Sequence, residues 1–451
     1  MNASSSTIEQ RMPATDMADG PALPRLLAGI QPRRSMTLQE HAQHHGPLPV
    51  LRRGGRRRGR ERSAMLIDEC ERSGLLGHGG AAFPLASKMR AVAAARGRAI
   101  VLANGAEGEP ASRKDRLLLE GLPQLVLDGG LIAAEALDAD ELVVCVCETA
   151  EAALHSMGRA IEEREAAIAP SRGAPRLRLA SVPAHYVAGQ ESALISHLSG
   201  GPAKPTFTPP RPSEQGLRRR PTLVNNLETL SHLALIARHG APWFRELGAP
   251  AHPGSALVTL SGPVPYPGVY EIEHGASLRS LIDAGGGTTA PVRAALIGGY
   301  AGTWIDGRLL SGVALSNEHL AVHDASLGAG VVLLLSAEAC PVAETLRSAE
   351  WLAGQSTGQC GPCVNGLPAI ARTLAELAAG RGGRGAGERI QQLAALTARR
   401  GACGHPDGAV KLILSALRVF RGEFAEHARR GPCELCARAP EMPLPRWLVS
   451  G

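Results

Sequence analysis

The sequence predicts an α/β protein with a parallel sheet, followed by a small β-grasp-like domain and a C-terminal bundle of four helices. Three observations predict this order. Apolar strands alternate with helices in the first half, short apolar runs between Pro and Gly turns begin near Ser255, and helical periodicity follows Cys340-Pro341. The length of 451 residues, 44% of them hydrophobic, is enough for several domains.

The first half predicts the parallel sheet. Apolar runs that end in a polar residue are typical of buried parallel strands, and a helix follows each of them. The expected strands are 98–104, 141–147 and 176–182, and the expected helices are 64–73, 85–96, 122–137, 150–167, 190–197 and 224–239. The Pro-rich stretch 201–221 is expected to be an ordered loop.

The second half predicts the other two domains. Four short runs (ALVTLSG, GVYEIEH, AALIGG and VVLLLSAEA) and one helix at 277–284 favour a β-grasp-like domain. Further on, the apolar residues that recur at helical spacing are Leu367, Ile370, Leu374 and Leu377, then Val410, Ile413, Leu414, Leu417 and Phe424. The Gly-rich break at 380–387 separates two expected helical hairpins, so four helices form a bundle.

The basic charge lies at the N-terminus. Residues 1–62 hold 11 Arg against 5 Asp and Glu, which equals the net charge of +6 of the whole chain. A nucleic-acid contact is one interpretation, but a solvated, disordered arm fits the composition better. We therefore expect no nucleic-acid partner. The expected domain limits are 1–61 for this arm, 62–245, 246–338 and 339–430 for the three folded parts, and 431–451 for a tail.

Cysteine usage and hydropathy indicate a cytoplasmic protein. No run of about 18 apolar residues predicts a membrane span, and the first twenty residues show no secretory signal pattern. Nine cysteines, an odd number, favour reduced thiols or a metal over disulfides.

Four polar motifs could bind a ligand. The loop GHGGAAFP at 77–84, with Lys88 one helical turn later, could hold a phosphate on backbone N–H groups, or it could be an ordinary connection. NGAEGEP at 104–110 follows a predicted strand, where ligands of open α/β sheets bind. The motifs YVAGQES at 186–192 and PTLVNNLET at 221–229 are weaker, because helix caps and buried amides explain them equally well.

The cysteines carry the most specific signal. Cys360 and Cys363 are separated by two residues, and Cys403 follows in a helical region. This spacing suits a cubane iron–sulfur cluster or zinc. Cys433 and Cys436 could serve a second site, although no other cysteine pair lies near them in the sequence. The remaining candidates for core residues are Cys70, Cys145 and Cys147.

Taken in order, these motifs resemble the NADH-oxidising flavoprotein subunit of respiratory complex I and its soluble relatives in hydrogenases and formate dehydrogenases. The resemblance covers about residues 62–430 and is carried by GHGGAAFP, NGAEGEPASRKDR, YVAGQESAL, RPTLVNNLETL and GQCGPC with the later Cys. It implies an FMN-binding α/β domain, a soluble-ligand-binding β-grasp domain and a helical domain that holds one [4Fe-4S] cluster.

The resemblance also implies roles for single residues. Glu107 would lie near the flavin ring, tune its electrostatics and so count as the catalytic residue. The residues that would line the FMN and nucleotide site are Gly77, Gly79, Gly80, Phe83, Lys88, Asn104, Glu107, Glu109, Asp115, Tyr186, Gly189, Glu191, Asn225, Asn226 and Thr229. The cluster ligands would be Cys360, Cys363 and Cys403.

Several positions depart from the family pattern. The Arg of the first loop is His78 and its last Gly is Ala82, an Asp of the second motif is Ala106, and one Glu of a Glu pair is Gln190. Two aromatic positions that stack on the nicotinamide nucleotide carry Arg113 and Arg211. Thr357 stands where a fourth cluster cysteine is expected. A cubane with three thiolates takes a hydroxyl, water or partner ligand on its fourth iron, or loses that iron to give [3Fe-4S].

These observations lead to one main hypothesis and two alternatives. The main one is a diaphorase-type NAD(P)H dehydrogenase that passes single electrons through FMN and the cluster to a ferredoxin-like protein, another oxidoreductase subunit or a quinone-linked acceptor. The first alternative is an FMN and iron–sulfur relay that is fed by a ferredoxin-like partner and oxidises no nucleotide. The second is a non-enzymatic scaffold whose thiols are empty or hold zinc.

Overall fold

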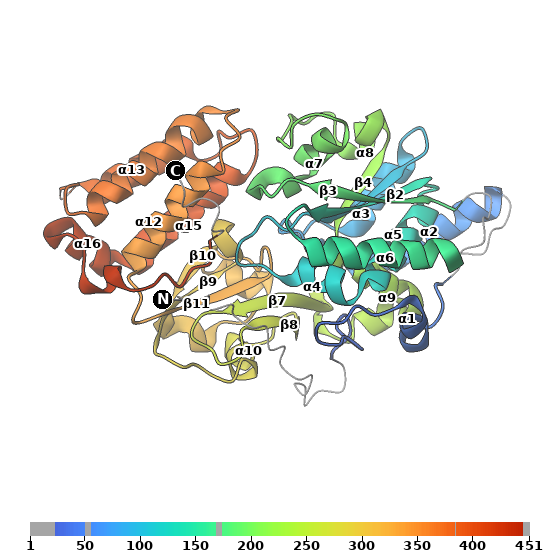
Figure 1. The fold of residues 1–451 in the computed structure, drawn as a ribbon, viewed down its shortest axis with the longest axis horizontal. Helices are drawn as coiled ribbons and strands as arrows, with labels where there is room; N and C mark the ends of the chain where they lie inside the picture. The colour runs from blue at the N-terminus through green and yellow to red at the C-terminus, as the bar shows by residue number, and fades with distance from the viewer. Residues whose placement is uncertain (1–22, 50–55, 168–173, 384, 445–451) are drawn as a thin grey trace, which may run out of the picture.

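The computed structural model describes residues 23–49, 56–167, 174–383 and 385–444, which form a parallel α/β layer, a mixed sheet and a helical region. Figure 1 shows the α/β layer on the right, the mixed sheet at the lower centre and the helical region on the left. This is the predicted fold class, with the three parts in the predicted order.

The α/β layer is built on a four-stranded sheet of order β3-β2-β1-β4, in which all neighbouring strands are parallel. The strands are β1 Ile100–Gly105, β2 Glu141–Cys147, β3 Arg176–Val182 and β4 Thr222–Asn226. We had predicted a helix from residue 224, and this was wrong for its first residues. The five residues of β4 run directly into the helix that starts at Leu227, so the helical periodicity masked the strand.

Helices cover the sheet. Those of the α/β layer are α2 Arg56–Ser73, α3 Leu85–Ala94, α4 Lys114–Gly121, α5 Pro123–Ala136, α6 Glu151–Ala167, α7 Glu191–Leu198, α8 Pro212–Gln215 and α9 Leu227–Phe244, with single turns at η1 Tyr186–Gly189 and η2 Leu217–Arg219. Helices α5 and α9 pack closely, because a Cβ atom at Gly129 would overlap the backbone of Leu230. Their apolar faces belong to the largest core cluster of the described residues.

The expected disorder of residues 1–61 is wrong for the part that the structure describes. Residues 23–49 contain α1 Leu38–His45, and Leu26 is fully buried. The Nε2 atom of His41 lies 2.7 Å from a carboxylate oxygen of buried Asp128 on α5. Residues 56–61 are helical as well, which agrees with the high helix propensity of Arg. Residues 1–22 and 50–55 lie outside the described part.

The mixed sheet has the order β10-β9-β11-β7-β8, with β7 and β11 parallel and the other pairs antiparallel. Its elements are β7 Ser255–Ser261, β8 Gly268–Glu273, α10 Leu278–Ala284, β9 Val292–Ile297, η3 Gly299–Ala301, β10 Thr303–Asp306, η4 Gly307–Gly312, α11 Asn317–Ala321 and β11 Val331–Ser336. A short ribbon, β5 Gly248–Ala249 with β6 His252–Pro253, precedes it. The sequence signals found four of these five sheet strands and missed β10, which has only four residues.

The helical region follows β11. It contains α12 Pro341–Gly354, the π-helical turn η5 Pro362–Gly366, α13 Leu367–Ala378, α14 Ala386–Thr397, α15 His405–Val419, α16 Arg421–Arg430 and the turn η6 Glu434–Ala437. The four predicted helices are present, but the last one breaks at Phe420 and continues as α16. Among the described helices, no single one is both long and apolar enough to cross a membrane; the bent pair α4 and α5 passes the same test by length and composition together.

Candidate functional site

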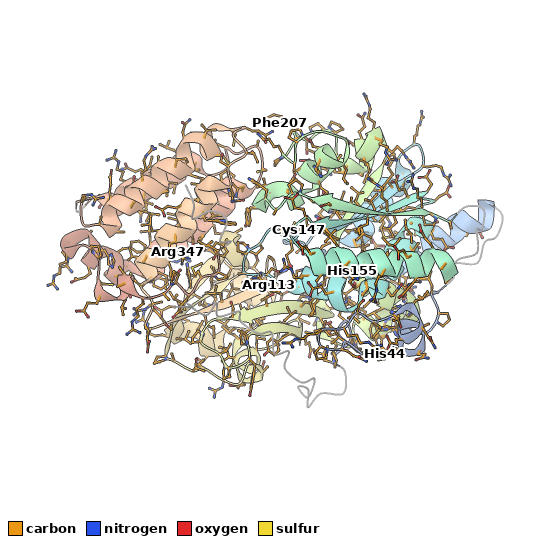
Figure 2. The ribbon with its side chains drawn as sticks, viewed as in Figure 1. His44, Arg113, Cys147, His155, Phe207 and Arg347 are labelled. Carbon is orange, nitrogen blue, oxygen red and sulfur yellow. The ribbon has the colours of Figure 1, made fainter. Side chains whose placement is uncertain are left out.

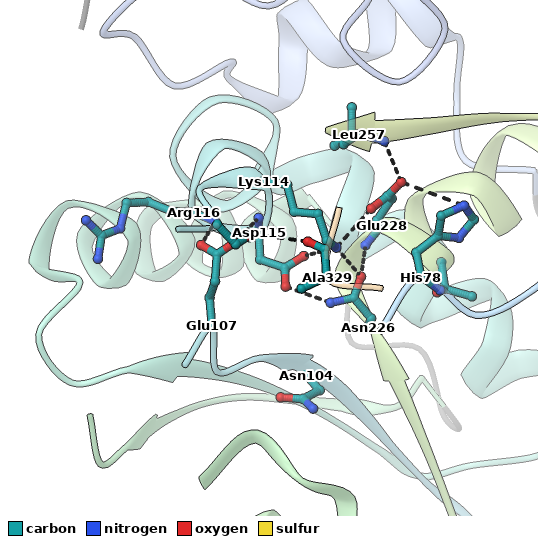
Figure 3. Close-up of polar contacts among 12 residues, drawn as sticks. His78, Asn104, Glu107, Lys114, Asp115, Arg116, Asn226, Glu228, Leu257 and Ala329 are labelled. Atoms are coloured by element: carbon teal, nitrogen blue, oxygen red, sulfur yellow. Dashed lines mark hydrogen bonds and ion pairs between the residues drawn. The ribbon is translucent and has the colours of Figure 1, made fainter. Parts of the chain in front are cut away.

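The residues predicted to bind FMN meet at the carboxyl edge of the parallel sheet. Asn104 lies near the end of β1, Tyr186 and Gly189 lie in the turn after β3, and Asn226 ends β4. Because the carboxyl ends of parallel strands share one edge, motifs that are more than 100 residues apart in sequence become neighbours. Figure 3 shows Asn104, Glu107 and Asn226 on this edge.

Two glycines allow the loops at this edge to touch. The side-chain amide of Asn104 donates to the carbonyl of Gly189 over 2.7 Å. A Cβ atom at Gly189 would lie 2.5 Å from the carbonyl oxygen of Ala106, and one at Gly108 would lie 2.7 Å from that of Tyr186. Glycine is therefore required at both positions by the close approach of two backbones.

The glycine-rich loop 77–84 lies beside this edge. Its backbone is held by a hydrogen bond from Gly77 N to Phe83 O of 2.9 Å and by one from His78 N to Thr229 Oγ1 of 2.9 Å. Gly80 has a φ of 106°, and a Cβ atom there would meet nothing within 4 Å. The loop thus exposes open backbone just before α3 begins, as a bound nucleotide requires.

Lys88 connects three of the predicted segments. Its ammonium group pairs with the carboxylate of Glu191 on α7 and donates to the carbonyl of Val224 on β4 over 3.2 Å. The side-chain nitrogen of Asn225, next along β4, is buried and has no hydrogen-bond partner. A buried amide without a partner costs stability, so this group is a natural contact for a ligand.

A buried ion network lies behind these residues (Figure 3). The Nζ atom of Lys114 lies 3.1 Å from Asp115, 3.0 Å from the side-chain oxygen of Asn226 and 2.9 Å from Glu228. Burial lowers the pKa of Lys114, but the nearby charges of Asp115 and Glu228 outweigh it, and the net shift is upward. Burial raises the pKa of Asp115 to about 6, against the charge of Lys114. The lysine therefore stays charged and fixes the amide of Asn226.

Glu107 and Glu109 have different environments. Predicted to lie near the flavin ring, Glu107 accepts hydrogen bonds from Ser112 Oγ at 2.5 Å and from the backbone N–H groups of Asp115 at 3.1 Å and Arg116 at 3.2 Å. It thus stabilises the start of α4. Glu109 accepts from the backbone N–H of Tyr300 at 2.9 Å, and burial raises its pKa to about 7.

A cavity of about 220 Å³ opens between the loop 77–84 and the mixed sheet. Of the predicted site residues, it includes Gly77 and Gly80. Its polar lining consists of side chains that the sequence analysis did not assign to a site: His78, Lys114, Glu228, His252, His274, Asn317 and Ser326. His252 and His274 stack with ring centroids 3.7 Å apart. These residues come from separate elements, and no local motif predicts that they meet.

The three predicted cluster cysteines lie together in the helical region. Cys360 precedes η5, Cys363 lies within it, and Cys403 lies just before α15. Burial raises the pKa of Cys363 to about 12, and the charges of Cys360 and Cys403 add to the shift. Among the described residues, these three thiols do not form a set whose ligand atoms all lie within 4.8 Å of one another, as a single ion requires. A polynuclear cluster binds each thiolate to a different iron, so the wider arrangement fits it.

Tyr186 connects the sheet edge to the cysteine loop. Its backbone N–H donates to the side-chain oxygen of Gln355 over 3.0 Å, and its ring lies 5.2 Å from that of Trp351 on α12 and 5.5 Å from that of His405 on α15. From the loop itself, Gln359 donates to the carbonyl of Pro205 over 3.0 Å. The two candidate sites are therefore adjacent parts of one region.

The departures from the family pattern have structural explanations at two positions. Arg113 donates to the carbonyls of Pro110 at 2.8 Å and Ser112 at 2.6 Å, so its guanidinium is bound to its own loop (Figure 2). Gln190 accepts from Ser192 N at 2.9 Å and Ala193 N at 3.0 Å and thereby caps α7. The backbone N–H of Arg211 donates to Glu214, and its residue is exposed.

Three family models match the chain, in the order of the three folded parts. They are the Nuo51 FMN-binding domain over residues 70–235, the SLBB domain over residues 257–300 and the NADH-ubiquinone oxidoreductase-F iron-sulfur binding region over residues 343–427. The chain therefore carries an FMN-binding domain and an iron–sulfur binding region.

Known proteins resemble the chain over most of its length. The second F-type subunit of the NADH-quinone oxidoreductase of Rhizobium meliloti is 32% identical over 379 residues, which are 82% of this chain and 90% of that protein. The F-type subunit of the Escherichia coli enzyme is 32% identical over 370 residues, 80% of this chain and 83% of that protein. A chain of the NAD+-reducing [NiFe]-hydrogenase in the H2-reduced state matches with a TM-score of 0.77 and 29% identity, over 88% of this chain and 67% of that chain.

Proposed function

Because the chain belongs to the family of F-type subunits of NADH-quinone oxidoreductase, we propose that it oxidises NADH at its FMN site and passes electrons through its iron–sulfur cluster to a partner. Bound FMN would supply the conversion from two-electron to one-electron chemistry, which neither a nicotinamide nor a cluster performs alone. The chain contributes the binding, the orientation and the electrostatics.

One observation carries this proposal: the adjacency of the sheet-edge site and the cysteine loop through Tyr186. The contacts of Tyr186 with Gln355, Trp351 and His405 keep the two sites in one packed region. Electron transfer requires such closeness, whereas two unrelated binding sites do not. The hydrogen bond from Gln359 to Pro205 supports the same arrangement from the side of the cysteine loop.

In this proposal the sheet edge holds the flavin nucleotide with neutral and charged groups. The open backbone around Gly80 and the ammonium group of Lys88 suit its phosphate, and the free amide of Asn225 suits its ribityl or ring oxygens. Glu107 acts through the position of α4, so its role near the ring stays a prediction. Glu109, with its pKa raised to about 7, is the carboxyl group whose charge changes near neutral pH.

The three thiols of Cys360, Cys363 and Cys403 would hold the cluster. Thr357 donates from its hydroxyl to the side-chain oxygen of Gln359 over 2.9 Å, so it has a partner within the loop. We therefore propose a cluster with three cysteine ligands, whose fourth iron takes water, a hydroxyl group or a ligand from a partner, or is lost to give [3Fe-4S].

For the nucleotide we propose NADH over NADPH. A 2′-phosphate needs a free cation. Arg113 is bound to the carbonyls of its own loop, and Lys88 is paired with Glu191. The carboxylate of Glu191 would repel a further phosphate group.

The partner in this proposal is another oxidoreductase subunit or a ferredoxin-like protein. The relatives are named as subunits of NADH-quinone oxidoreductase, and the structural match is an NAD+-reducing hydrogenase. We propose a cytoplasmic location, since all nine cysteines of the chain are free in the structure, as in a reducing compartment.

A second candidate function follows from Arg113. An Arg at a position where the family has an aromatic ring removes a stacking surface for the nicotinamide nucleotide, and its guanidinium points to carbonyls instead. An FMN and iron–sulfur relay fed by a ferredoxin-like partner, without nucleotide oxidation, is the function that this change favours.

Anaerobic purification followed by spectroscopy separates the two candidates. NADH oxidation predicts a flavin spectrum with broad iron absorption, both bleached by NADH. Bleaching only by dithionite or reduced ferredoxin would contradict it and support the relay. A colourless protein that takes up neither flavin nor iron on reconstitution would contradict both and leave a scaffold.

A matched pair of lysine variants tests the flavin site. Lys88→Ala should lower the affinity for FMN at least about tenfold, because a charge-assisted contact is lost. Lys204→Ala, at an exposed lysine outside the site, should leave it unchanged. Equal FMN affinity in both variants would contradict the assignment of Lys88.

A further inference from the structure

Four metal-binding side chains outside the flavin and cluster sites meet where the C-terminal segment returns to the helical region. Cys340 caps the start of α12, His427 lies near the end of α16, and Cys433 and Cys436 flank the turn η6. Their three sulfur atoms and one imidazole nitrogen all lie within 4.8 Å of one another. The sequence analysis noted only Cys433 and Cys436, because Cys340 lies almost a hundred residues earlier.

The distances fit a single tetrahedral ion. The sulfur of Cys436 lies 3.4 Å from that of Cys340 and 3.8 Å from that of Cys433. The Nε2 atom of His427 lies 3.5 Å from the sulfur of Cys340 and 3.9 Å from that of Cys436. A tetrahedral zinc ion with bonds of about 2.3 Å to sulfur and about 2.0 Å to nitrogen places neighbouring ligand atoms about 3.5–3.8 Å apart.

The histidine is oriented as a metal ligand. His427 is almost fully buried, and its Nδ1 atom lies 3.3 Å from the carbonyl oxygen of Ala378 on α13. A hydrogen bond from Nδ1 to a carbonyl leaves the lone pair of Nε2 free to face the sulfurs, which is how metal-bound histidines are usually held. The backbone N–H of Ala343 also lies 3.4 Å from the sulfur of Cys340, where it can donate to a thiolate.

We propose that Cys340, His427, Cys433 and Cys436 form a structural Cys3His zinc site, separate from the cysteines that hold the iron–sulfur cluster. Four protein ligands close the coordination sphere, and this is the pattern of structural rather than catalytic zinc. On binding, the three thiols become thiolates and release their protons to solvent, while the imidazole stays neutral.

An iron–sulfur cluster is a poorer fit to this second group. Its thiolates would bind different irons, so their sulfurs would lie farther apart than those of ligands to one ion. A disulfide would use two of the three sulfurs and leave the third with His427, and all nine cysteines are free in the structure. Zinc uses all four side chains.

The site would anchor the segment 431–444, which joins the helical region to the mixed sheet. In this segment Glu441 accepts from Ser336 N on β11 at 2.9 Å, and its own N–H donates to Glu344 on α12 over 2.8 Å. The hydroxyl of Tyr300 donates to the carbonyl of Pro443 over 2.6 Å. The zinc site therefore stabilises the contact between two parts of the molecule and takes no part in electron transfer.

Metal analysis of the full-length chain tests the assignment. The chain, purified after growth with added Zn2+, should contain about one zinc. Cys436→Ser should lose it at least tenfold and keep its iron, whereas Cys403→Ser should lose iron and keep zinc. The matched control is Cys147→Ser, a thiol on β2 outside both sites (Figure 2), which should keep both metals.

X-ray absorption at the zinc edge tests the same site in the unchanged chain, so the result does not depend on how a variant folds. It should show about three sulfurs at about 2.3 Å and one nitrogen at about 2.0 Å. Oxygen ligands, a chain without zinc, zinc retained in Cys436→Ser, or iron lost from Cys436→Ser together with zinc would each overturn the proposal.

Discussion

The two groups of cysteines in the helical region differ in how sequence and structure identify them. Cys360, Cys363 and Cys403 were found from their spacing, and their arrangement is too wide for one ion. Cys433 and Cys436 have the same two-residue spacing, but the other two ligands of their group, Cys340 and His427, come from distant helix ends that only the fold brings together. The comparison teaches that a C-x2-C pair locates a metal site, whereas its partners decide which metal it holds.

The largest effect is expected from removing a cluster ligand. Cys403→Ser should abolish iron incorporation, because a cluster that already lacks a fourth cysteine has no thiolate to spare. Iron analysis and the visible spectrum measure the loss, and zinc content should stay constant. Unchanged iron would show that these cysteines are not the ligands and would erase the difference between the two groups.

The next effect concerns stability. His427→Ala should lower zinc affinity by at least tenfold and the thermal midpoint by several degrees, since about 1 kcal/mol shifts the midpoint of a large domain by about 2–4 °C. The control is His155→Ala on α6, which is exposed (Figure 2). Calorimetry with and without added Zn2+ measures both. Equal midpoints in the two variants would argue against a structural ion.

A smaller effect is expected at the position that departs from the family. Thr357→Cys should supply a fourth thiolate to the cluster and raise the proportion of [4Fe-4S] over [3Fe-4S] several-fold. Electron paramagnetic resonance of the oxidised protein measures this ratio. A ratio that does not change would indicate that the fourth iron already has a firm ligand or that residue 357 lies too far from it.

The sequence was sufficient for the fold class because its strands and helices have strong local patterns. Strands β1, β2 and β3 are continuous apolar runs, and most predicted helices were found within a few residues of their observed ends. Strands β4 and β10 were missed because each is short, and β4 joins a helix without a turn. The order in residues 23–49 depends on tertiary contacts such as that between His41 and Asp128, which composition cannot reveal.

For the candidate site, the sequence identified the segments but not their contacts. It placed Asn104, Tyr186 and Asn226 at strand ends, and parallel topology brings strand ends together. It did not indicate that Glu107 would support α4 or that Gln355 would link Tyr186 to the cysteine loop. Those contacts depend on how separate loops pack, so the individual roles of the predicted site residues stay predictions.

The histidines of the cavity should show what a ligand-rich group does without a proposed metal. Burial, and then the charge of His78, lowers the pKa of His252 to about 4, and burial also lowers the pKa of His78 and, well below its usual value, that of His274. The unfolded chain then binds more protons between about pH 6.5 and about pH 4. Stability is therefore fully present above about pH 6.5 and decreases as the pH falls through this range.

His252→Gln should remove part of this dependence. After allowance for solvent screening, we expect the stability difference between pH 7 and pH 5 to shrink by about 1 kcal/mol. Glu109, Lys114 and Glu228 are unchanged in the variant, so their own titration cancels in the comparison. Denaturant unfolding of both chains at the two pH values measures it. A pH dependence that equals the original chain's would mean that His252 titrates alike in the folded and unfolded states, and the cavity would then not resist protonation as its burial implies.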